Sequence, residues 1–178
     1  SFVLGLQGPC ATFETACSSS LVAAHAAARA LQHAECTTHL VAGVNLMLRQ
    51  AASISMAIAS MTSVAGRCHT FDRRADGFVR GEGCGAAVVR VRDDSDTGRV
   101  QRCGSAVRSD GRSASLTAPN GQAQQELLHS ALSDASLEAR VVSINESHGT
   151  GTPLGDPIEA GSLAAAVLSQ QRPGENLV

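Results

Sequence analysis

The sequence predicts an α/β fold built around a buried sheet. Short apolar runs between polar flanks, which are typical of buried strands, alternate along the 178 residues with alanine- or leucine-rich segments of helical spacing. Such alternation is characteristic of α/β architecture. The composition is 43% hydrophobic and 17% charged, which indicates a soluble globular chain of about one domain and not a disordered one.

The first half of the chain is expected to contain two helices and two strands. Residues 18–34 hold seven alanines and little polar surface, so they predict a mostly buried helix. The apolar run 39–45 predicts a buried strand, 51–61 a second helix and 86–92 another strand. Glycines and charged residues are interleaved over 71–85, which predicts an ordered loop.

The second half is expected to begin after a linker, the polar and turn-rich residues 93–99. The apolar residues within 100–107 predict a strand. Over 120–137 the apolar side chains fall on one face at helical spacing, which predicts an amphipathic helix. The apolar run 141–146 predicts a further strand.

A last helix is expected to begin at Asp156. Asp is a favoured N-cap residue, Pro157 suits the first helical position, and Glu159 lies three residues after the cap. The helix is expected to end near residue 168.

Several function classes are excluded by residues that the chain lacks. All 14 basic residues are arginine, so the chain can form neither a Walker A phosphate loop nor a lysine Schiff base. The net charge of −2 and the absence of Trp and Tyr argue against a nucleic-acid-binding surface. No apolar run is long enough to span a membrane.

Six cysteines are present, and none of their spacings is that of a CxxC zinc or redox pair. His33, Cys36 and His39 form an H-x-x-C-x-x-H run, but no fourth ligand is evident, so no metal is expected. Free thiols and the lack of a visible signal peptide favour an intracellular, cytoplasmic protein. Because the chain starts at Ser1, it is interpreted as an internal fragment of a longer protein.

One candidate site is Cys17, directly before the alanine-rich helix. Free backbone N–H groups and the positive end of the helix dipole favour a thiolate at such a position. The small neighbours Ala16 and Ser18 leave room for a substrate. A buried, unreactive structural cysteine is the alternative interpretation.

A second candidate site is His148, which directly follows the expected strand 141–146. Ligands of α/β proteins gather at the carboxyl ends of strands. Neighbouring glycines permit close approach of a ligand to the backbone, and the hydroxyls of Thr150 and Thr152 can bind a polar ligand. Leu154 occupies the last glycine position of a GxGxxG motif, so a dinucleotide site is not indicated. A loop histidine that binds its own backbone is the alternative.

Five segments in fixed order identify a family. They read GPCATFETACSSSL (8–21), VAGVNLML (41–48), DRRADGFVRGEGCG (72–85), SDGRSASLTAPNG (109–121) and ESHGTGTPLGDPIE (146–159). Together they resemble the β-ketoacyl synthase, or ketosynthase, of type I polyketide synthases, over essentially the whole chain. Thiolases and chalcone-synthase-like enzymes are competing interpretations, but the HGTGTPLGDPIE string argues against both.

This resemblance implies a thiolase-like fold with α-β-α-β-α layers, of which the chain would be a part. About residues 1–99 would form the later part of the N-terminal half, with the nucleophile, and about 100–178 the start of the C-terminal half. A second active-site histidine and a lysine of the family would lie beyond residue 178. The intact domain is expected to be a homodimer.

The resemblance also implies roles for the candidate residues. Cys17 would accept the acyl chain and its N–H would form half of an oxyanion hole. His148 would be the first active-site histidine, and Thr150 and Thr152 would contact the phosphopantetheine arm of an acyl carrier protein. The implied reaction is decarboxylative condensation with a malonyl-type extender in polyketide or fatty acid biosynthesis, without a further cofactor.

One alternative function and one set of acidic residues complete the expectations from the sequence. A non-condensing, ketosynthase-like partner subunit is the alternative function, although such partners lack the cysteine. The acidic residues Asp72, Asp76 and Glu82 are expected to bind backbone and arginine groups that hold their loop near the site, and not to act in catalysis.

Overall fold

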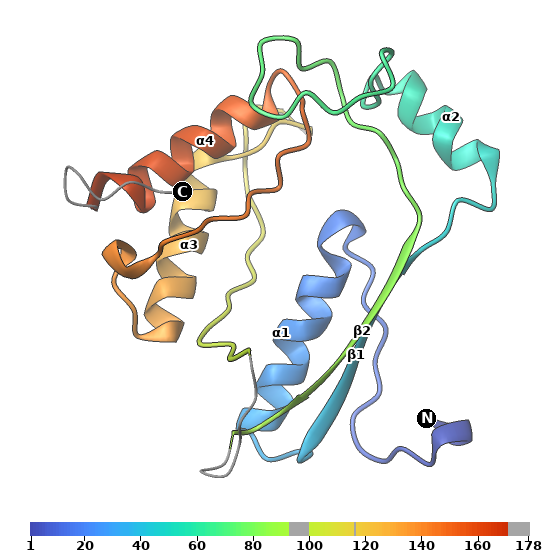
Figure 1. Ribbon diagram of the computed structural model, residues 1–178, viewed down its shortest axis with the longest axis vertical. Coiled ribbons are helices and arrows are strands. Elements are labelled where there is room, and N and C mark those ends of the chain that lie inside the picture. The colour runs from blue at the N-terminus through green and yellow to red at the C-terminus, as the bar shows by residue number, and fades with distance from the viewer. Residues whose placement is uncertain (93–99, 116, 171–178) are drawn as a thin grey trace. The chain divides into compact units, whose positions relative to one another are not determined.

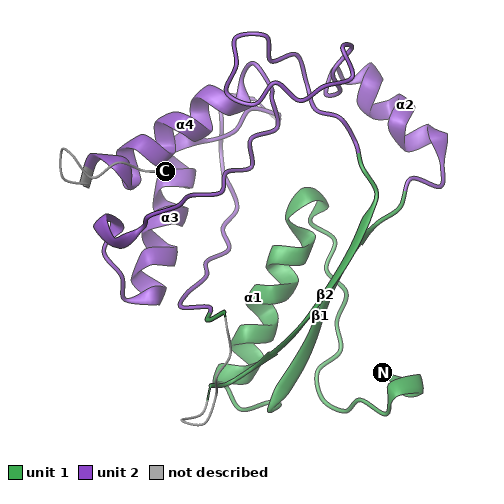
Figure 2. Cartoon of the chain, viewed as in Figure 1, with its two compact units in different colours: residues 1–46, 81–101 green, residues 47–80, 102–178 purple. Residues whose placement is uncertain are grey.

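The computed structural model describes residues 1–92, 100–115 and 117–170 (Figure 1). It divides into two compact units, residues 1–46 with 81–101 and residues 47–80 with 102–178 (Figure 2). The expected linker 93–99 lies outside the described residues. Among those that are described, no helix is long and apolar enough to cross a membrane.

The first unit is a helix packed on a two-stranded ribbon (Figure 1). Helix α1 (Ser19–Gln32) covers strand β1 (Thr38–Asn45), which pairs antiparallel with β2 (Gly83–Arg90). A Cβ added at Gly43 would lie 2.8 Å from the Cβ of Ser20, so glycine is what lets α1 lie close against β1. The helix and the first strand confirm the sequence prediction within two residues, and β2 begins three residues earlier than expected.

Burial in this unit is lower than the sequence predicted. Four residues of α1 are buried, all near its end, whereas Leu21 near its start is 73% exposed. Leu40, Val44 and Val88 on the ribbon are also exposed. The expectation of a mostly buried helix and a buried strand is therefore wrong for the described residues, because each element is covered on one side only.

The second unit is mainly helical. Its helices are α2 (Gln50–Ile58), α3 (Gly121–Ala135) and α4 (Gly155–Ala166), with short 3-10 turns at Ala139–Val141 and Leu168–Gln170. The Asn120 side chain caps α3 by accepting hydrogen bonds from the N–H groups of Gln122 and Ala123. The core between α3 and α4 consists of Ala139, Ala166 and Val167, with Leu128, Leu132, Val142 and Leu163 packed around them.

Two strands that were expected in the second half of the chain are wrong. Residues 100–107, all described, form no regular element, and 141–146 continue from a 3-10 turn as unpaired chain. The first segment lies against α3, where the Ser105 N–H donates to Asp134 Oδ2 at 2.8 Å. A Cβ at Gly104 would lie 2.5 Å from the backbone nitrogen of Ala135. An apolar run becomes a strand only when a neighbouring strand takes up its backbone hydrogen bonds, and neither segment has one among the described residues.

Candidate active site

Cys17 lies in a tight turn that leads into α1. The 3-10 turn Ala16–Ser18 precedes the helix, and the cysteine is exposed. Ala16 has a φ of 55°, a left-handed conformation that costs a non-glycine residue about 1–3 kcal/mol. Such strain persists only where the surrounding contacts hold it. The cysteine is therefore presented by a backbone that is fixed at a sharp bend.

Neighbouring hydroxyl groups fix this bend. The Thr15 N–H donates to Ser19 Oγ at 2.8 Å, and the Ser19 hydroxyl in turn donates to the Ala16 carbonyl at 2.8 Å. The Ser18 hydroxyl donates to the Thr15 carbonyl at 3.0 Å. Within the described residues the Cys17 N–H has no hydrogen-bond partner. This free donor at the start of a helix is what an oxyanion-binding group requires.

His148 lies in the loop before α4, and the backbone of that loop is held by the helix. The Glu159 carboxylate accepts hydrogen bonds from the His148 N–H at 2.6 Å and the Gly149 N–H at 2.8 Å. The His148 residue itself is exposed. Glu159 thus holds the backbone at the residue that carries the imidazole.

Asp156 connects this loop to a second one. Its Oδ1 accepts from the N–H groups of Gly151 at 3.0 Å and Thr152 at 3.2 Å, and its Oδ2 accepts from the Phe71 N–H at 2.7 Å. Asp156 is 4% exposed. Its carboxylate also lies in the first turn of α4, where the helix dipole favours negative charge.

The expected N-cap role of Asp156 is therefore wrong. Helix α4 begins at Gly155, the N-cap position is Leu154, and Asp156 lies inside the helix. The Thr152 hydroxyl accepts from the Gly155 N–H at 3.2 Å and so takes the place of the cap. The sequence rule failed because the carboxylate binds backbone N–H groups of two loops instead of those of its own helix.

Thr150 and Thr152 lie next to each other. Their hydroxyl oxygens are 3.3 Å apart, and both residues are partly buried. One loop thus carries His148 and both threonines, all in the second unit. Cys17 belongs to the first unit.

The loop 69–77 packs against the loop that carries His148. The Gly77 N–H donates to the Gly151 carbonyl at 2.9 Å, and the Thr70 hydroxyl donates to the Gly149 carbonyl at 2.6 Å. Gly151 has a φ of 75°, and a Cβ there would lie 2.9 Å from the His69 nitrogen. Glycine is therefore required at this position by both conformation and space.

The acidic residues of this loop have structural partners. Hydrogen bonds from the Arg74 side chain and N–H hold the pKa of Asp72 well below its usual range. The pKa of Asp76 is lowered mainly by a hydrogen bond from Ser63. Its buried Oδ1, however, has no partner among the described residues. The contacts of Asp72 are those expected from the sequence.

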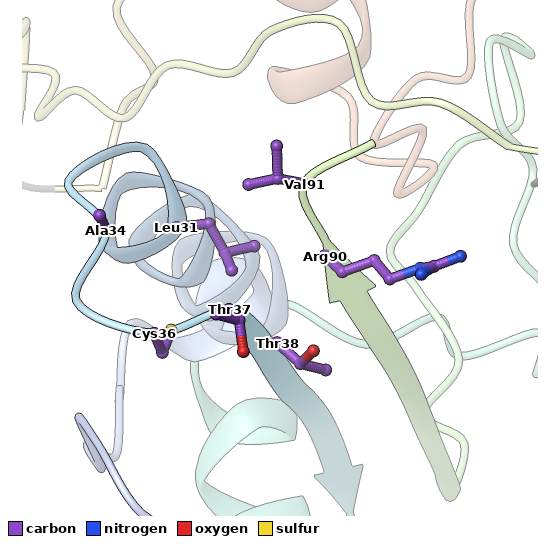
Figure 3. Close-up of a pocket in the computed structure, with 7 residues that line it drawn as sticks. All are labelled: Leu31, Ala34, Cys36, Thr37, Thr38, Arg90 and Val91. Atoms are coloured by element: carbon purple, nitrogen blue, oxygen red, sulfur yellow. The ribbon is translucent and has the colours of Figure 1, made fainter. Parts of the chain in front are cut away.

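A shallow groove lies at the other end of α1 and contains none of the predicted site residues. Figure 3 shows its lining, formed by Leu31, Ala34, Cys36, Thr37, Thr38, Arg90 and Val91. Cys36 is the only member of the H-x-x-C-x-x-H run that lines it. In the part of the chain that is described, no group of three or more His, Cys, Asp or Glu side chains is arranged to hold a metal ion.

The sequence named Glu159 only as part of a helix cap, and it did not identify Thr70. Asp156 and Glu159 are three residues apart on a helix, so they lie on one face and can contact the same loop. That spacing was a usable signal for Glu159. Thr70 gave none, because its partner is 79 residues away in the chain.

Comparison with known proteins establishes the family. The sequence model of the β-ketoacyl synthase N-terminal domain matches residues 1–95, and that of the C-terminal domain matches residues 101–178. The chain therefore belongs to the β-ketoacyl synthase family and has the thiolase-like α/β fold of its members.

The chain is similar to polyketide synthases and spans less than a tenth of the length of the curated relative described next. It is 47% identical to a phenolphthiocerol/phthiocerol polyketide synthase of Mycobacterium tuberculosis over 182 aligned residues, which cover 100% of the chain and 8% of that protein. It is 37% identical to a solved ketosynthase from module 6 of the bacillaene synthase of Bacillus subtilis, with a TM-score of 0.90. An oxazolomycin ketosynthase domain from Streptomyces albus is 32% identical, with the same TM-score. The alignments cover 97% of this chain and 31–32% of those solved chains.

Proposed function

We propose that the chain carries the nucleophile and one active-site histidine of a ketosynthase that extends acyl chains in polyketide biosynthesis. The observation that supports this most is the exposed Cys17 with a free N–H at the start of α1. The sulfur is accessible to a thioester, and the free N–H can bind the oxygen of its carbonyl group. A non-condensing partner subunit needs neither feature.

The first proposed step is loading. The Cys17 sulfur attacks the carbonyl carbon of an acyl thioester, the new S–C bond forms, and the carrier thiol leaves. Negative charge develops on the carbonyl oxygen in the tetrahedral intermediate. The Cys17 N–H donates to this oxygen and lowers the barrier, and the dipole of α1 adds to the stabilisation.

The second proposed step is decarboxylation. A malonyl-type thioester loses carbon dioxide, and the electron pair of the broken C–C bond passes into an enolate whose charge rests on the thioester oxygen. His148 is the proposed donor to that oxygen. Its backbone is fixed by Glu159 through hydrogen bonds of 2.6 and 2.8 Å to residues 148 and 149, which suits a group that must meet a transient charge.

The third proposed step is condensation. The enolate carbon attacks the carbonyl carbon of the acyl-Cys17 thioester, the S–C bond breaks, and the cysteine thiolate is regenerated. The product is a β-ketoacyl thioester that is two carbons longer. Atoms and electrons balance without an oxidant or reductant, so no cofactor beyond the carrier's own phosphopantetheine is expected.

The proposed partners are acyl carrier proteins and a second copy of the domain. The adjacent hydroxyls of Thr150 and Thr152, 3.3 Å apart, form a polar pair that suits the amide groups of a phosphopantetheine arm. The homodimer and the cytoplasmic location expected from the sequence stay predictions.

The experiment is a condensation assay on the intact ketosynthase that contains this chain, supplied with an acyl thioester and a malonyl carrier protein. The wild type is expected to form β-ketoacyl product, and Cys17→Ala to form none. Cys10→Ala is the matched control, since Cys10 is another exposed free thiol in the same unit, and its product is expected to be normal. Normal product from Cys17→Ala would contradict the proposal.

A further inference from the structure

Thr70 makes a close contact with the loop that carries His148. Its hydroxyl donates to the Gly149 carbonyl at 2.6 Å, although the two residues are 79 positions apart. Its methyl group lies against the same glycine, where an added Cβ would be 2.7 Å from Thr70 Cγ2. Both branches of the threonine thus contact the residue directly after His148.

The contact completes the support of the His148 backbone. On one side, Glu159 binds the N–H groups of His148 and Gly149. On the other side, Thr70 binds the Gly149 carbonyl. Gly149 has a φ of 53°, a left-handed conformation, and glycine has little intrinsic preference for it over other conformations. An external hydrogen bond to the Gly149 carbonyl is what selects one orientation of the peptide group between Gly149 and Thr150.

The segment that carries Thr70 is itself anchored to the same loop and to the first turn of α4. The Phe71 N–H donates to Asp156 Oδ2 at 2.7 Å, and the Gly77 N–H donates to the Gly151 carbonyl at 2.9 Å. Phe71 has a φ of 55°, which is strained for a non-glycine residue and marks a backbone held by its surroundings. The backbone on both sides of Thr70 is therefore held in place by hydrogen bonds.

We propose that Thr70 is a positioning residue. Its hydroxyl orients the peptide group between Gly149 and Thr150 and thereby the His148 side chain. This rests on the proposed function, because it assigns Thr70 to the step in which His148 donates to the enolate oxygen. The Cys17 loading step does not use this donor. The proposal therefore predicts that loss of the hydroxyl slows decarboxylation and leaves loading intact.

Loss of the Thr70 hydroxyl is expected to lower the rate of decarboxylation less than removal of the His148 side chain does. A displacement of 1 Å at a reacting group can cost about 10²-fold in rate. Loss of the Thr70 contact leaves the two Glu159 contacts in place, so the His148 side chain should move by less than about 1 Å. We therefore expect the decarboxylation rate to fall on the order of 10-fold.

Three variants of the intact ketosynthase separate the contribution of the Thr70 hydroxyl from that of its methyl group. Thr70→Val keeps the shape and the methyl contact but removes the donor. Thr70→Ser keeps the donor and removes the methyl group. Thr38→Val is the matched control, since Thr38 is exposed at the start of β1 in the other unit. For each variant, carbon dioxide release from malonyl carrier protein, acyl loading of Cys17 and the thermal midpoint are measured.

Thr70→Val is expected to lower the kcat of decarboxylation about 10-fold, with normal loading and a thermal midpoint near that of the wild type. Thr70→Ser and Thr38→Val are expected to decarboxylate at near wild-type rates. The positioning role is overturned if Thr70→Val decarboxylates normally, if it slows loading equally, or if Thr70→Ser is as slow as Thr70→Val. A wild-type enzyme that neither loads nor decarboxylates would overturn the proposed function itself, and the role of Thr70 with it.

Discussion

Replacement of Asp156 by alanine should destabilise the intact ketosynthase strongly. The side chain is 4% exposed and accepts hydrogen bonds from three backbone N–H groups, those of Gly151, Thr152 and Phe71. Alanine leaves these donors without an acceptor. At about 1–1.5 kcal/mol for each buried or partly buried donor left unsatisfied, the loss is about 3–5 kcal/mol in the free energy of unfolding.

The assay is urea unfolding of the wild type and three variants. Asp156→Asn keeps one acceptor oxygen and is expected to fall between the wild type and Asp156→Ala. Asp72→Ala is the matched control, since this acidic residue of the second unit is bound by the exposed Arg74, and little change is expected. An unfolding midpoint of Asp156→Ala equal to that of Asp72→Ala would refute the role of Asp156 as the link between the two loops.

Three further predictions concern the proposed chemistry and the isolated chain. His148→Ala should slow decarboxylation about 10²–10³-fold while Cys17 still loads, and normal decarboxylation with abolished loading would contradict the assigned role. Limiting alkylation of the intact domain, followed by peptide mapping, should label Cys17 before the other five cysteines, and a preference for Cys68 or Cys84 would count against it. Residues 1–178 expressed alone should self-associate and form no β-ketoacyl product, because apolar side chains of the ribbon are exposed. A monomeric, cooperatively folding and active chain would show that prediction to be wrong.

The elements that sequence reasoning located correctly are those with local causes. Helices α1 and α3 follow from alanine content and from apolar spacing within one segment. Helix α4 follows from the local start signals around Asp156, although Asp156 is not its cap. The strands expected at 100–107 and 141–146 failed because pairing depends on a neighbour elsewhere in the chain. The hydrophobicity of a segment predicts that it is buried, but it does not predict which other segment packs against it or pairs with it.

The same distinction applies to the candidate site. Cys17 was selected by its place before a helix, and the structure places it there. His148 was selected by a glycine-bearing loop after an expected strand; the loop lies before α4, but the strand is absent from the described residues. The contacts that hold Cys17 and His148 in place could not be predicted from local sequence. The strain at Ala16 is a property of the folded turn, and the contact of Thr70 with Gly149 joins segments that are far apart in sequence.

Locating the acyl group after loading decides whether Cys17 carries the acyl chain. The intact ketosynthase is incubated with an acyl thioester in the absence of extender, digested, and analysed by tandem mass spectrometry. One acyl adduct is expected, on the Cys17 sulfur, and it is expected to disappear in Cys17→Ala. An adduct on any of the other five cysteines, or one that persists in Cys17→Ala, would contradict it.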